Sequence, residues 1–130
     1  MGTRCLTFVY NEMYEPLVTI YRQFDGYPGG HGKELANFLK DRTLINGIPP
    51  EKKMQKVSNG MDCLAASLVA ELKTEIGNIY VVPTYSKNCN QDYEYHIYDE
   101  TVVVKNYNGD VLFSGKWNLL EDFCNEDDDC

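Results

Sequence analysis

Residues 59–77 read NGMDCLAASLVAELKTEIG, and they carry the strongest periodic signal in the chain. Their apolar positions follow spacings of three, one and four residues, which place them on one face of an α-helix. These positions are Met61, Leu64, Ala65, Leu68, Val69, Leu72 and Ile76. Asn59 followed by Asp62 resembles a capping pair, and Gly77 supplies a C-terminal stop. The sequence therefore predicts an amphipathic helix of about four turns within this segment.

The chain before this helix predicts a β-hairpin and a second, shorter helix. Residues 4–10 (RCLTFVY) and 16–24 (PLVTIYRQF) are rich in β-branched and aromatic residues, and the short segment between them predicts a turn. Residues 25–32 hold four glycines and one proline, a composition that argues against regular structure. The apolar stripe of residues 33–40 predicts a short helix, and residues 41–58 predict a loop.

The chain after the long helix predicts four strands. They occupy residues 79–85, 93–98, 101–107 and 111–116. Pro83 breaks the first strand or puts it at a sheet edge, and the Asn-Gly-Asp sequence at 108–110 predicts a tight turn between the last two. In the second strand Glu94, His96 and Tyr98 alternate with three apolar or aromatic residues, so they should share one face.

Together these elements predict one α+β domain over residues 1–124. We expect an antiparallel β-sheet with an N-terminal hairpin, two central α-helices and a C-terminal β-meander. Residues 118–121 resemble a capping box, which predicts a brief terminal helix, and residues 125–130 form an acidic tail. A chain of 130 residues is long enough to bury a core without a disulfide or a metal.

The net charge of −8 is concentrated at the C-terminus. Six of the 20 acidic residues, and none of the 12 basic ones, lie among the last ten positions. We expect these residues to be solvated. The rest of the chain is close to neutral, so duplex DNA or RNA is a disfavoured partner, because phosphate contacts need a basic face. A small anionic ligand needs only a few clustered cations and is still allowed.

The apolar runs and the cysteines indicate in which cellular compartment the protein acts. No apolar run approaches the roughly 18 residues of a membrane span, and the N-terminus lacks a signal-peptide pattern. The five cysteines are odd in number and include no Cys-x-x-Cys pair, so we expect reduced thiols in a cytoplasmic protein without a membrane partner. A zinc site would require distant residues to meet His31 or His96, so we expect no metal and no other cofactor.

Residues 24–32 (FDGYPGGHG) are the most suggestive of a binding site. A glycine-rich turn before a helix can expose backbone N–H groups near the positive end of the helix dipole, where a phosphate binds well. The segment matches neither the P-loop nor the dinucleotide fingerprint, and a tight turn whose glycines adopt positive φ explains it equally well. Arg22 and His31 bracket the turn and Phe24 and Tyr27 lie in it, so all four are candidate ligand-binding residues. The alternatives are an acidic partner for Arg22 and a capping role for His31.

Tyrosine is frequent, with ten in the chain and five of them between residues 80 and 98. Tyrosines on a sheet can stack a nucleobase, form a protein interface or pack within the sheet. Packing is the simplest reading of any single tyrosine, but for the group we expect a binding or oligomer surface. The sequence contains no Gly-x-Ser-x-Gly and no His-Glu-x-x-His, so it predicts a binding protein rather than an enzyme.

Six strings, in the same order, resemble one known family. They are MGTRC at the start, YRQFDGY at 21–27, GHGKEL at 30–35, NG at 46–47, NGMDC at 59–63 and YEYHIY at 93–98. They look like the small phage proteins that antagonise Thoeris defence, and the resemblance covers nearly the whole chain. It implies a non-enzymatic protein, acting in the cytoplasm of the infected bacterial host, that sequesters a cyclic ADP-ribose isomer made by a TIR-domain enzyme.

The resemblance also implies an assembly and a site. Members are homo-oligomers built from dimers, they hold the ligand near the dimer interface, and some bind small cyclic oligonucleotides at a separate site. The family's ligand residues fall here on Tyr80, Asn90, Lys105 and Lys116. If relatives carry arginine at the last two positions, lysine gives up bidentate phosphate pairing, which leaves the preferred nucleotide open. The alternative function is an acidic protein that inhibits a host defence protein by direct contact.

Overall fold

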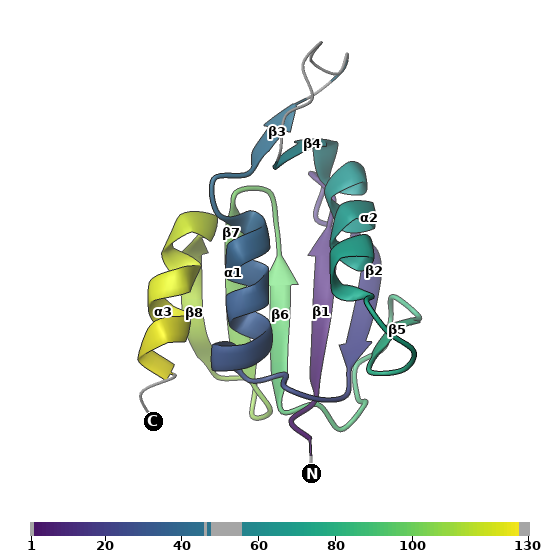
Figure 1. Ribbon diagram of the computed structural model, residues 1–130, viewed down its shortest axis with the longest axis vertical. Helices are drawn as coiled ribbons and strands as arrows, with labels where there is room; N and C mark the ends of the chain where they lie inside the picture. Colours follow the sequence, from purple (N-terminus) through teal and green to yellow (C-terminus); the bar gives the residue numbers. More distant parts are fainter. Residues whose placement is uncertain (1, 46, 48–55, 128–130) are drawn as a thin grey trace.

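The computed structural model describes residues 2–45, 47 and 56–127 (Figure 1). Its strands are β1 (Cys5–Tyr10), β2 (Pro16–Arg22), β3 (Thr43–Ile45), β4 (Val57–Asn59), β5 (Ile79–Val82), β6 (Tyr93–Ile97), β7 (Thr101–Asn106) and β8 (Val111–Lys116). Its helices are α1 (Lys33–Leu39), α2 (Gly60–Leu72) and α3 (Leu120–Asp127). A π-helical turn, η1 (Pro28–Gly32), precedes α1, and a 3-10 turn, η2 (Trp117–Leu119), precedes α3. The fold is α+β, as predicted.

Six strands form one sheet in the order β5-β2-β1-β6-β7-β8 (Figure 1). The hairpin β1–β2 and the meander β6–β7–β8 are antiparallel, which confirms both predictions. These two units join through β1 and β6, and this pair is parallel, with Cys5 opposite Tyr93 and Val9 opposite Ile97. The expectation of an antiparallel sheet is therefore wrong at this junction. The side-chain pattern of a strand does not encode its direction, which depends on where the intervening chain returns to the sheet.

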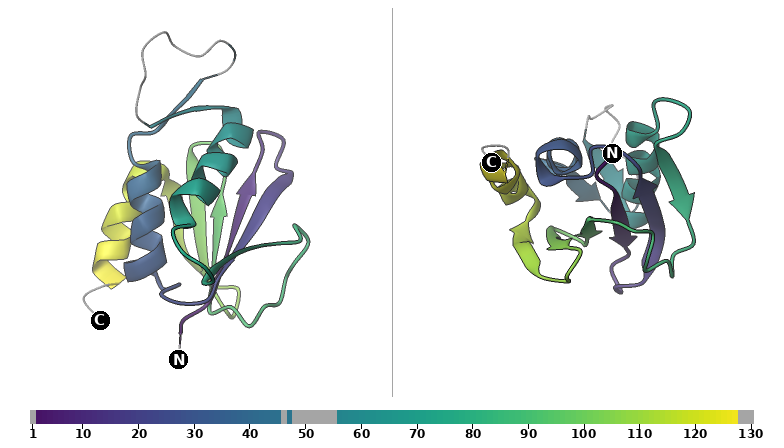
Figure 2. Two further views of the ribbon diagram at one scale, coloured as in Figure 1. Left: turned by 45° about the vertical axis from the view of Figure 1, so that its right-hand side comes forward. Right: turned by 90° about the horizontal axis from the view of Figure 1, so that it is seen from below.

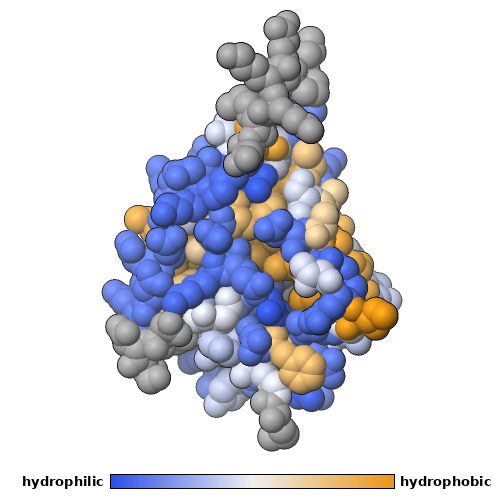
Figure 3. Space-filling model, in the orientation of Figure 1, coloured by the Kyte–Doolittle hydropathy of each residue, from blue (hydrophilic) through white to orange (hydrophobic). Residues whose placement is uncertain are grey.

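The three helices cover the same face of the sheet (Figures 1 and 2). The alternation along β7 shows the two sides: Val102 and Val104 are buried in the core, whereas Val103 and Lys105 point away from it. We call the side on which Val103 and Lys105 lie the helix-free face. In Figure 3 the helix-covered side is largely hydrophilic, with hydrophobic residues between α1 and α2 and along the margin formed by α2 and β5.

The long helix has the predicted position and buried face, but it is shorter than predicted. Its fully or nearly fully buried residues are Met61, Leu64, Ala65, Leu68 and Leu72. The helix ends at Leu72, and Ile76 is fully exposed. The chain has to reverse before Ile79, which is buried in β5, and Gly77 and Asn78 make this turn with positive φ. The helical spacing of Ile76 therefore carries no structural meaning.

A residue distant in the sequence caps the N-terminus of α2. Glu12, in the β1–β2 turn, accepts a hydrogen bond from the backbone N–H of Met61 at 3.0 Å. Asn59 makes no side-chain bond to the helix, and its amide instead pairs with the backbone N–H and oxygen of Gly47 at 3.1 and 3.0 Å. The predicted capping pair of Asn59 and Asp62 is wrong, because a tertiary contact supplies the acceptor.

Three segments predicted to be irregular contain regular structure. The turn η1 runs directly into α1, so part of the glycine-rich segment is helical. In the predicted loop over 41–58, β3 pairs with β4 in parallel, with Thr43 opposite Val57. The rest of that predicted loop, including Lys52 and Lys53, lies outside the described residues. Helix α3 reaches Asp127, so the acidic tail begins as a helix, and its last three positions also lie outside the described residues.

Several local predictions are confirmed. The stripe of α1 is buried: Leu35, Ala36, Phe38 and Leu39. Strand β5 stops before Pro83 and lies at a sheet edge, because proline cannot donate to a further ladder bond. Gly109 has a φ of 84° in the turn between β7 and β8.

Among the described cysteines, Cys5, Cys63 and Cys89 are free thiols. Cys130 lies outside the described residues. None of the helices in the described ranges combines the length and apolar character that a membrane span requires.

Candidate functional site

The structure brings Arg22 and His31 together, but inside the protein. Arg22 donates to His31 Nδ1 at 3.2 Å, to the backbone oxygen of Phe24 at 2.6 Å and to the carboxylate of Glu34. On its other side, the fully buried His31 contacts Thr7 Oγ1 through Nε2 at 2.7 Å. Glu34 is therefore the acidic partner that the alternative interpretation of Arg22 predicted. Both Arg22 and His31 are buried and contribute to the core.

The surroundings of His31 determine its protonation state. Burial lowers the pKa of His31 to about 3, and the positive charge of Arg22 acts in the same direction. Since Arg22 can only donate, Nδ1 of His31 is the acceptor in this pair. The remaining ring hydrogen is on Nε2, which donates to Thr7. His31 is thus a neutral structural residue at pH 7.

The glycine-rich turn does not offer its N–H groups to a ligand. The backbone N–H groups of Gly30 and Gly32 both donate to the backbone oxygen of Tyr27, at 2.9 and 3.4 Å. Neither glycine has positive φ, so the turn does not need them for their backbone conformation. It needs them because neighbouring atoms leave no room for a side chain. A Cβ on Gly30 would lie 2.6 Å from the backbone oxygen of Asp25, and one on Gly32 would lie 2.7 Å from Cys124 Sγ. The geometry therefore gives no support to an anion site at this turn.

Phe24 and Tyr27 are the candidate residues of this segment that face solvent. Their side chains are 48% and 38% exposed. The backbone N–H of Phe24 donates to Asn78 Oδ1 at 2.9 Å, which fixes the main chain and leaves the ring available. Both residues can contribute to a surface, but Arg22 and His31 do not share that surface with them.

The four residues implied by the family resemblance lie apart within one chain. Tyr80 is in β5 at one edge of the sheet, and Lys116 ends β8 at the other edge. Four strands lie between these edges, which places them about 24 Å apart. Lys105 lies on the helix-free face of β7, and Asn90 lies exposed in the loop between β5 and β6. A small ligand cannot contact Tyr80 and Lys116 of the same chain.

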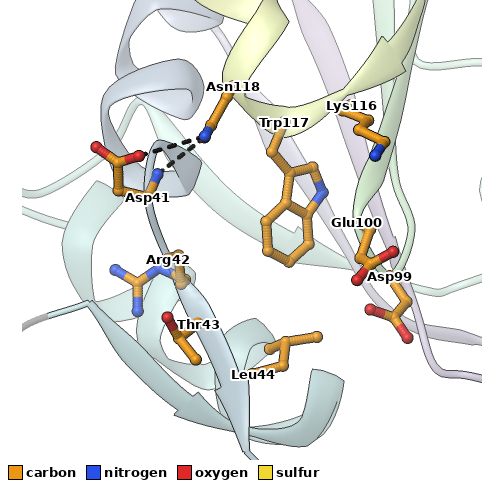
Figure 4. A pocket seen from close by; sticks show the side chains of 9 residues that line it. All are labelled: Asp41, Arg42, Thr43, Leu44, Asp99, Glu100, Lys116, Trp117 and Asn118. Carbon is orange, nitrogen blue, oxygen red and sulfur yellow. Dashed lines mark hydrogen bonds between the residues drawn. The ribbon is translucent and has the colours of Figure 1, made fainter.

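Lys116 lines a cleft of about 390 Å³ beside η2 (Figure 4). The lining residues are Asp41, Arg42, Thr43, Leu44, Asp99, Glu100, Lys116, Trp117 and Asn118. In Figure 4 the side chains of Asp99, Glu100 and Lys116 lie on the same wall. Burial raises the pKa of Asp99, and the charges of Glu100 and Glu12 add to the effect. A phosphate would meet more negative than positive charge here, so this cleft is a poor anion site.

A second groove, of about 380 Å³, lies on the helix-free face between the sheet and residues 84–87. Its lining residues are Phe8, Tyr10, Pro16, Thr84, Tyr85, Ser86, Lys87, Glu94 and His96, and we call it the aromatic groove. The loop is held over the sheet by Thr19, whose Oγ1 donates to the backbone oxygen of Thr84 at 3.3 Å. The volume falls within the range of small-molecule sites, roughly 300–1,000 Å³.

Aromatic rings stack in pairs along the sheet side of this groove. Phe8 and His96 are opposite each other in β1 and β6, with ring centroids 4.7 Å apart and planes at 11°. The rings of Tyr10 and Tyr98 stack in the same way, at 4.5 Å and 8°. Tyr85, on the loop side, is 80% exposed. A flat ring that enters the groove therefore meets aromatic side chains from the sheet and from the loop.

His96 connects Tyr10 to Glu94 in this groove. Its Nδ1 lies 2.7 Å from Tyr10 Oη, and its Nε2 lies 3.0 Å from Glu94 Oε1. Burial lowers the pKa of His96 although Glu94 opposes this effect, and the positive charge of Lys105 lowers the pKa further. Burial also raises the pKa of Tyr10, with contributions from Tyr98 and Glu94. Both groups are therefore neutral at pH 7.

The order hydroxyl, imidazole, carboxylate in Tyr10, His96 and Glu94 is that of a catalytic triad. A nucleophile requires a lowered pKa or an effective base. The raised pKa of Tyr10 and the lowered pKa of its partner His96 act against both requirements. Among the described residues, no group of three or more His, Cys, Asp and Glu side chains could hold a metal ion.

None of the eight candidate site residues lines the aromatic groove, although Tyr85 belongs to the tyrosine cluster that predicted a binding surface. The alternation in residues 93–98 placed Glu94, His96 and Tyr98 on one face, and this signal pointed toward the groove. The missing information was the parallel register that puts Phe8 beside His96. A residue that is 88 positions away in sequence cannot be assigned as a neighbour from local patterns.

The aromatic groove is the strongest candidate site, because it combines stacking rings, a lysine and fixed hydrogen-bonding groups in one cavity. The glycine-rich turn and the cleft beside η2 lack this combination. Comparisons of the chain with protein-family models, with curated proteins and with solved structures find no match.

Proposed function

We propose that this protein binds a cyclic ADP-ribose isomer and sequesters it without cleaving it. In this proposal it is a phage anti-defence protein that removes the Thoeris signal in the cytoplasm of the infected host. The observation that carries the proposal is the aromatic groove, with Phe8, Tyr10 and Tyr85 around one cavity. The sequence resemblance to the phage family is the second support.

The chemistry of this ligand suits the groove. An adenine ring can stack on the aromatic side chains, which contributes about 1–3 kcal/mol per base. Lys87 lines the cavity, and the charge of Lys105 is near enough to affect His96. These two lysines are candidates for pairing with the two phosphates. Glu94 adds an acceptor for ribose hydroxyl groups.

The proposal includes an oligomer built from dimers. Tyr80 and Lys116 lie at opposite sheet edges, so a ligand that touched both would have to sit between two chains. Edge strands also present unpaired backbone groups to a second copy. Tyr80 and Val81 on β5 are 45% and 62% exposed, which gives that edge an apolar contact surface. Sedimentation that shows only a 14.9 kDa species at micromolar concentration would contradict this part of the proposal.

The function is tested by incubating the protein with the product of a TIR-domain enzyme. After removal of free nucleotide and heat denaturation, we expect mass analysis to recover the cyclic nucleotide intact and in stoichiometric amount. Recovery of a linear product would replace sequestration with hydrolysis. Absence of any retained nucleotide would rule out the proposed function.

Tyr85→Ala should weaken binding of the cyclic nucleotide by about ten- to hundredfold, because it removes a stacking face. Tyr85 is 80% exposed, so the fold should survive the change. The matched control is Tyr107→Ala, which removes another exposed tyrosine in the β7–β8 turn, away from the groove. Calorimetric titration of both variants is the measurement. Equal affinities would move the site away from the aromatic groove.

One observation favours the alternative, an acidic inhibitor of a host protein. Glu12, Asp62, Asp99 and Glu100 line a single cavity of about 660 Å³, so part of the acidity belongs to the folded domain and not to the tail. Such a surface fits a basic protein partner. In the retention experiment this function predicts that the nucleotide is ignored and that a basic host protein is bound in a salt-sensitive manner.

A further inference from the structure

The hydrogen bonds around His96 have a fixed direction. The Glu94 carboxylate offers acceptor oxygens, so Nε2 of His96, at 3.0 Å, carries a hydrogen. His96 is neutral at pH 7, because burial holds its pKa below the ordinary value of 6.5. Its Nδ1 therefore has no hydrogen and accepts one. Tyr10 Oη therefore donates its hydrogen to Nδ1 of His96, and the two atoms are 2.7 Å apart.

This direction decides what Tyr10 can offer to the groove. Its single hydrogen is donated to His96, so its oxygen presents lone pairs only, and the Tyr98 side chain is a hydrogen-bond partner of this oxygen. Gln91 donates to the second oxygen of Glu94 at 3.1 Å, which holds the carboxylate in position. The polar and charged groups around His96 are Tyr10 on β1, Glu94 and Tyr98 on the β6 segment, Lys105 on β7 and Lys87 on the loop side of the groove. The lysine side chains in this set are those of Lys87 and Lys105.

We infer that the aromatic groove selects a flat ring that carries an amino donor, as adenine does, and that Tyr10 Oη accepts the hydrogen bond. The inference deepens the proposed function and rests on it for the class of ligand. An aromatic amine fits better than a sugar hydroxyl, because the acceptor lies among rings: Phe8 is centred 6.5 Å from Tyr10, and Tyr85 lines the same cavity. A ring without an amino group cannot donate to the lone pair of Tyr10 Oη that Tyr98 does not use.

The probes are adenosine and purine riboside, which differ only by the amino group of adenosine. We expect both nucleosides to shift the amide signals of residues 84–87 in NMR titrations, with adenosine binding up to about tenfold more tightly. Tyr10→Phe keeps the ring that stacks on Tyr98 and removes the acceptor, so the two nucleosides should then bind equally. Tyr107→Phe is the matched control, and it should keep the preference.

A second measurement reads the hydrogen-bond direction without a ligand. The imidazole 15N shifts of His96 at pH 7 should report the neutral tautomer with hydrogen on Nε2. Glu94→Gln introduces a side chain that can donate as well as accept, so the tautomers should mix and the preference for adenosine should decrease. A protonated ring or the opposite tautomer in the parent protein would overturn the inference.

The outcomes separate this inference from the proposed function. Equal binding of the two nucleosides by the parent, a preference that persists in Tyr10→Phe, or no binding of either nucleoside overturns the inference, whatever the cyclic nucleotide does. If the cyclic nucleotide is not retained but the parent prefers adenosine and Tyr10→Phe does not, the inference stands and the proposed function falls.

Discussion

Between pH 7.5 and pH 4.5, His31 should reduce the free energy of unfolding by roughly 2–3 kcal/mol. The unfolded chain takes up a proton on this histidine near its ordinary pKa of 6.5, whereas the folded chain resists protonation until about pH 3. The unfolded state therefore binds more protons throughout this window, and stability is lost as the pH falls. Protonated Nδ1 would face the guanidinium of Arg22, which has no acceptor to offer.

The measurement is urea unfolding of the parent and of His31→Gln at pH values from 7.5 to 4.5. A glutamine amide can donate toward Thr7 and accept from Arg22, but it does not titrate. At pH 7.5 the variant should be less stable by roughly 1–3 kcal/mol, because the ring packed against Tyr95 is lost. The difference should shrink by roughly 2–3 kcal/mol as the pH reaches 4.5. Parallel pH curves would show that His31 titrates normally in the folded protein.

Arg22→Met should lower the free energy of unfolding by roughly 3 kcal/mol, because each of two acceptors that lose their donor costs about 1–3 kcal/mol. The Arg22 guanidinium donates to Phe24, His31 and Glu34. In the variant, the backbone oxygen of Phe24 and Nδ1 of His31 lose their hydrogen-bond donor. Glu34 contributes less to the loss, because its side chain is 52% exposed and can be rehydrated. Urea unfolding followed by circular dichroism at pH 7.5 is the measurement.

Arg22→Lys is the control, since it keeps the charge and loses the planar fork. It should be less stable than the parent and more stable than Arg22→Met. It should also retain the cyclic nucleotide like the parent, because Arg22 points into the fold and not into the aromatic groove. A stable Arg22→Met variant that no longer binds the nucleotide would restore Arg22 as a ligand residue. Arg22 and His31 are in contact, so the effects of changing both should not add.

The helices and strands were largely predictable, because each must bury one face and therefore repeats its apolar residues at its own period. The stripe from Met61 to Leu72 and the buried pair Val102 and Val104 show this correspondence. Ile76 continues the helical spacing but is exposed, since the chain turns back toward β5. A periodic pattern shows that a helix is possible and does not show where a neighbouring strand requires it to stop.

The candidate site was much less predictable. The composition of the glycine-rich turn resembles that of anion sites. Gly32 is nevertheless needed for packing, because its backbone lies close to Cys124 on α3. Arg22 looked available because the sequence could not show that Glu34 and His31 surround it. The aromatic groove, in contrast, is assembled from residues 8–16 and residues 84–96, which are far apart in the chain.

The sequence by itself determined the α+β class, the hairpin, the meander and the amphipathic face of the long helix, because these depend on contacts between residues close in the chain. Only the tertiary structure decided the parallel pairing of β1 with β6, and with it the neighbours of His96. The physical reason is that a strand's alternation specifies which face is buried and does not specify which strand lies beside it. The same pairing stacks Phe8 on His96 and aligns Tyr10 with Tyr98, so the site arises from the register and not from a motif.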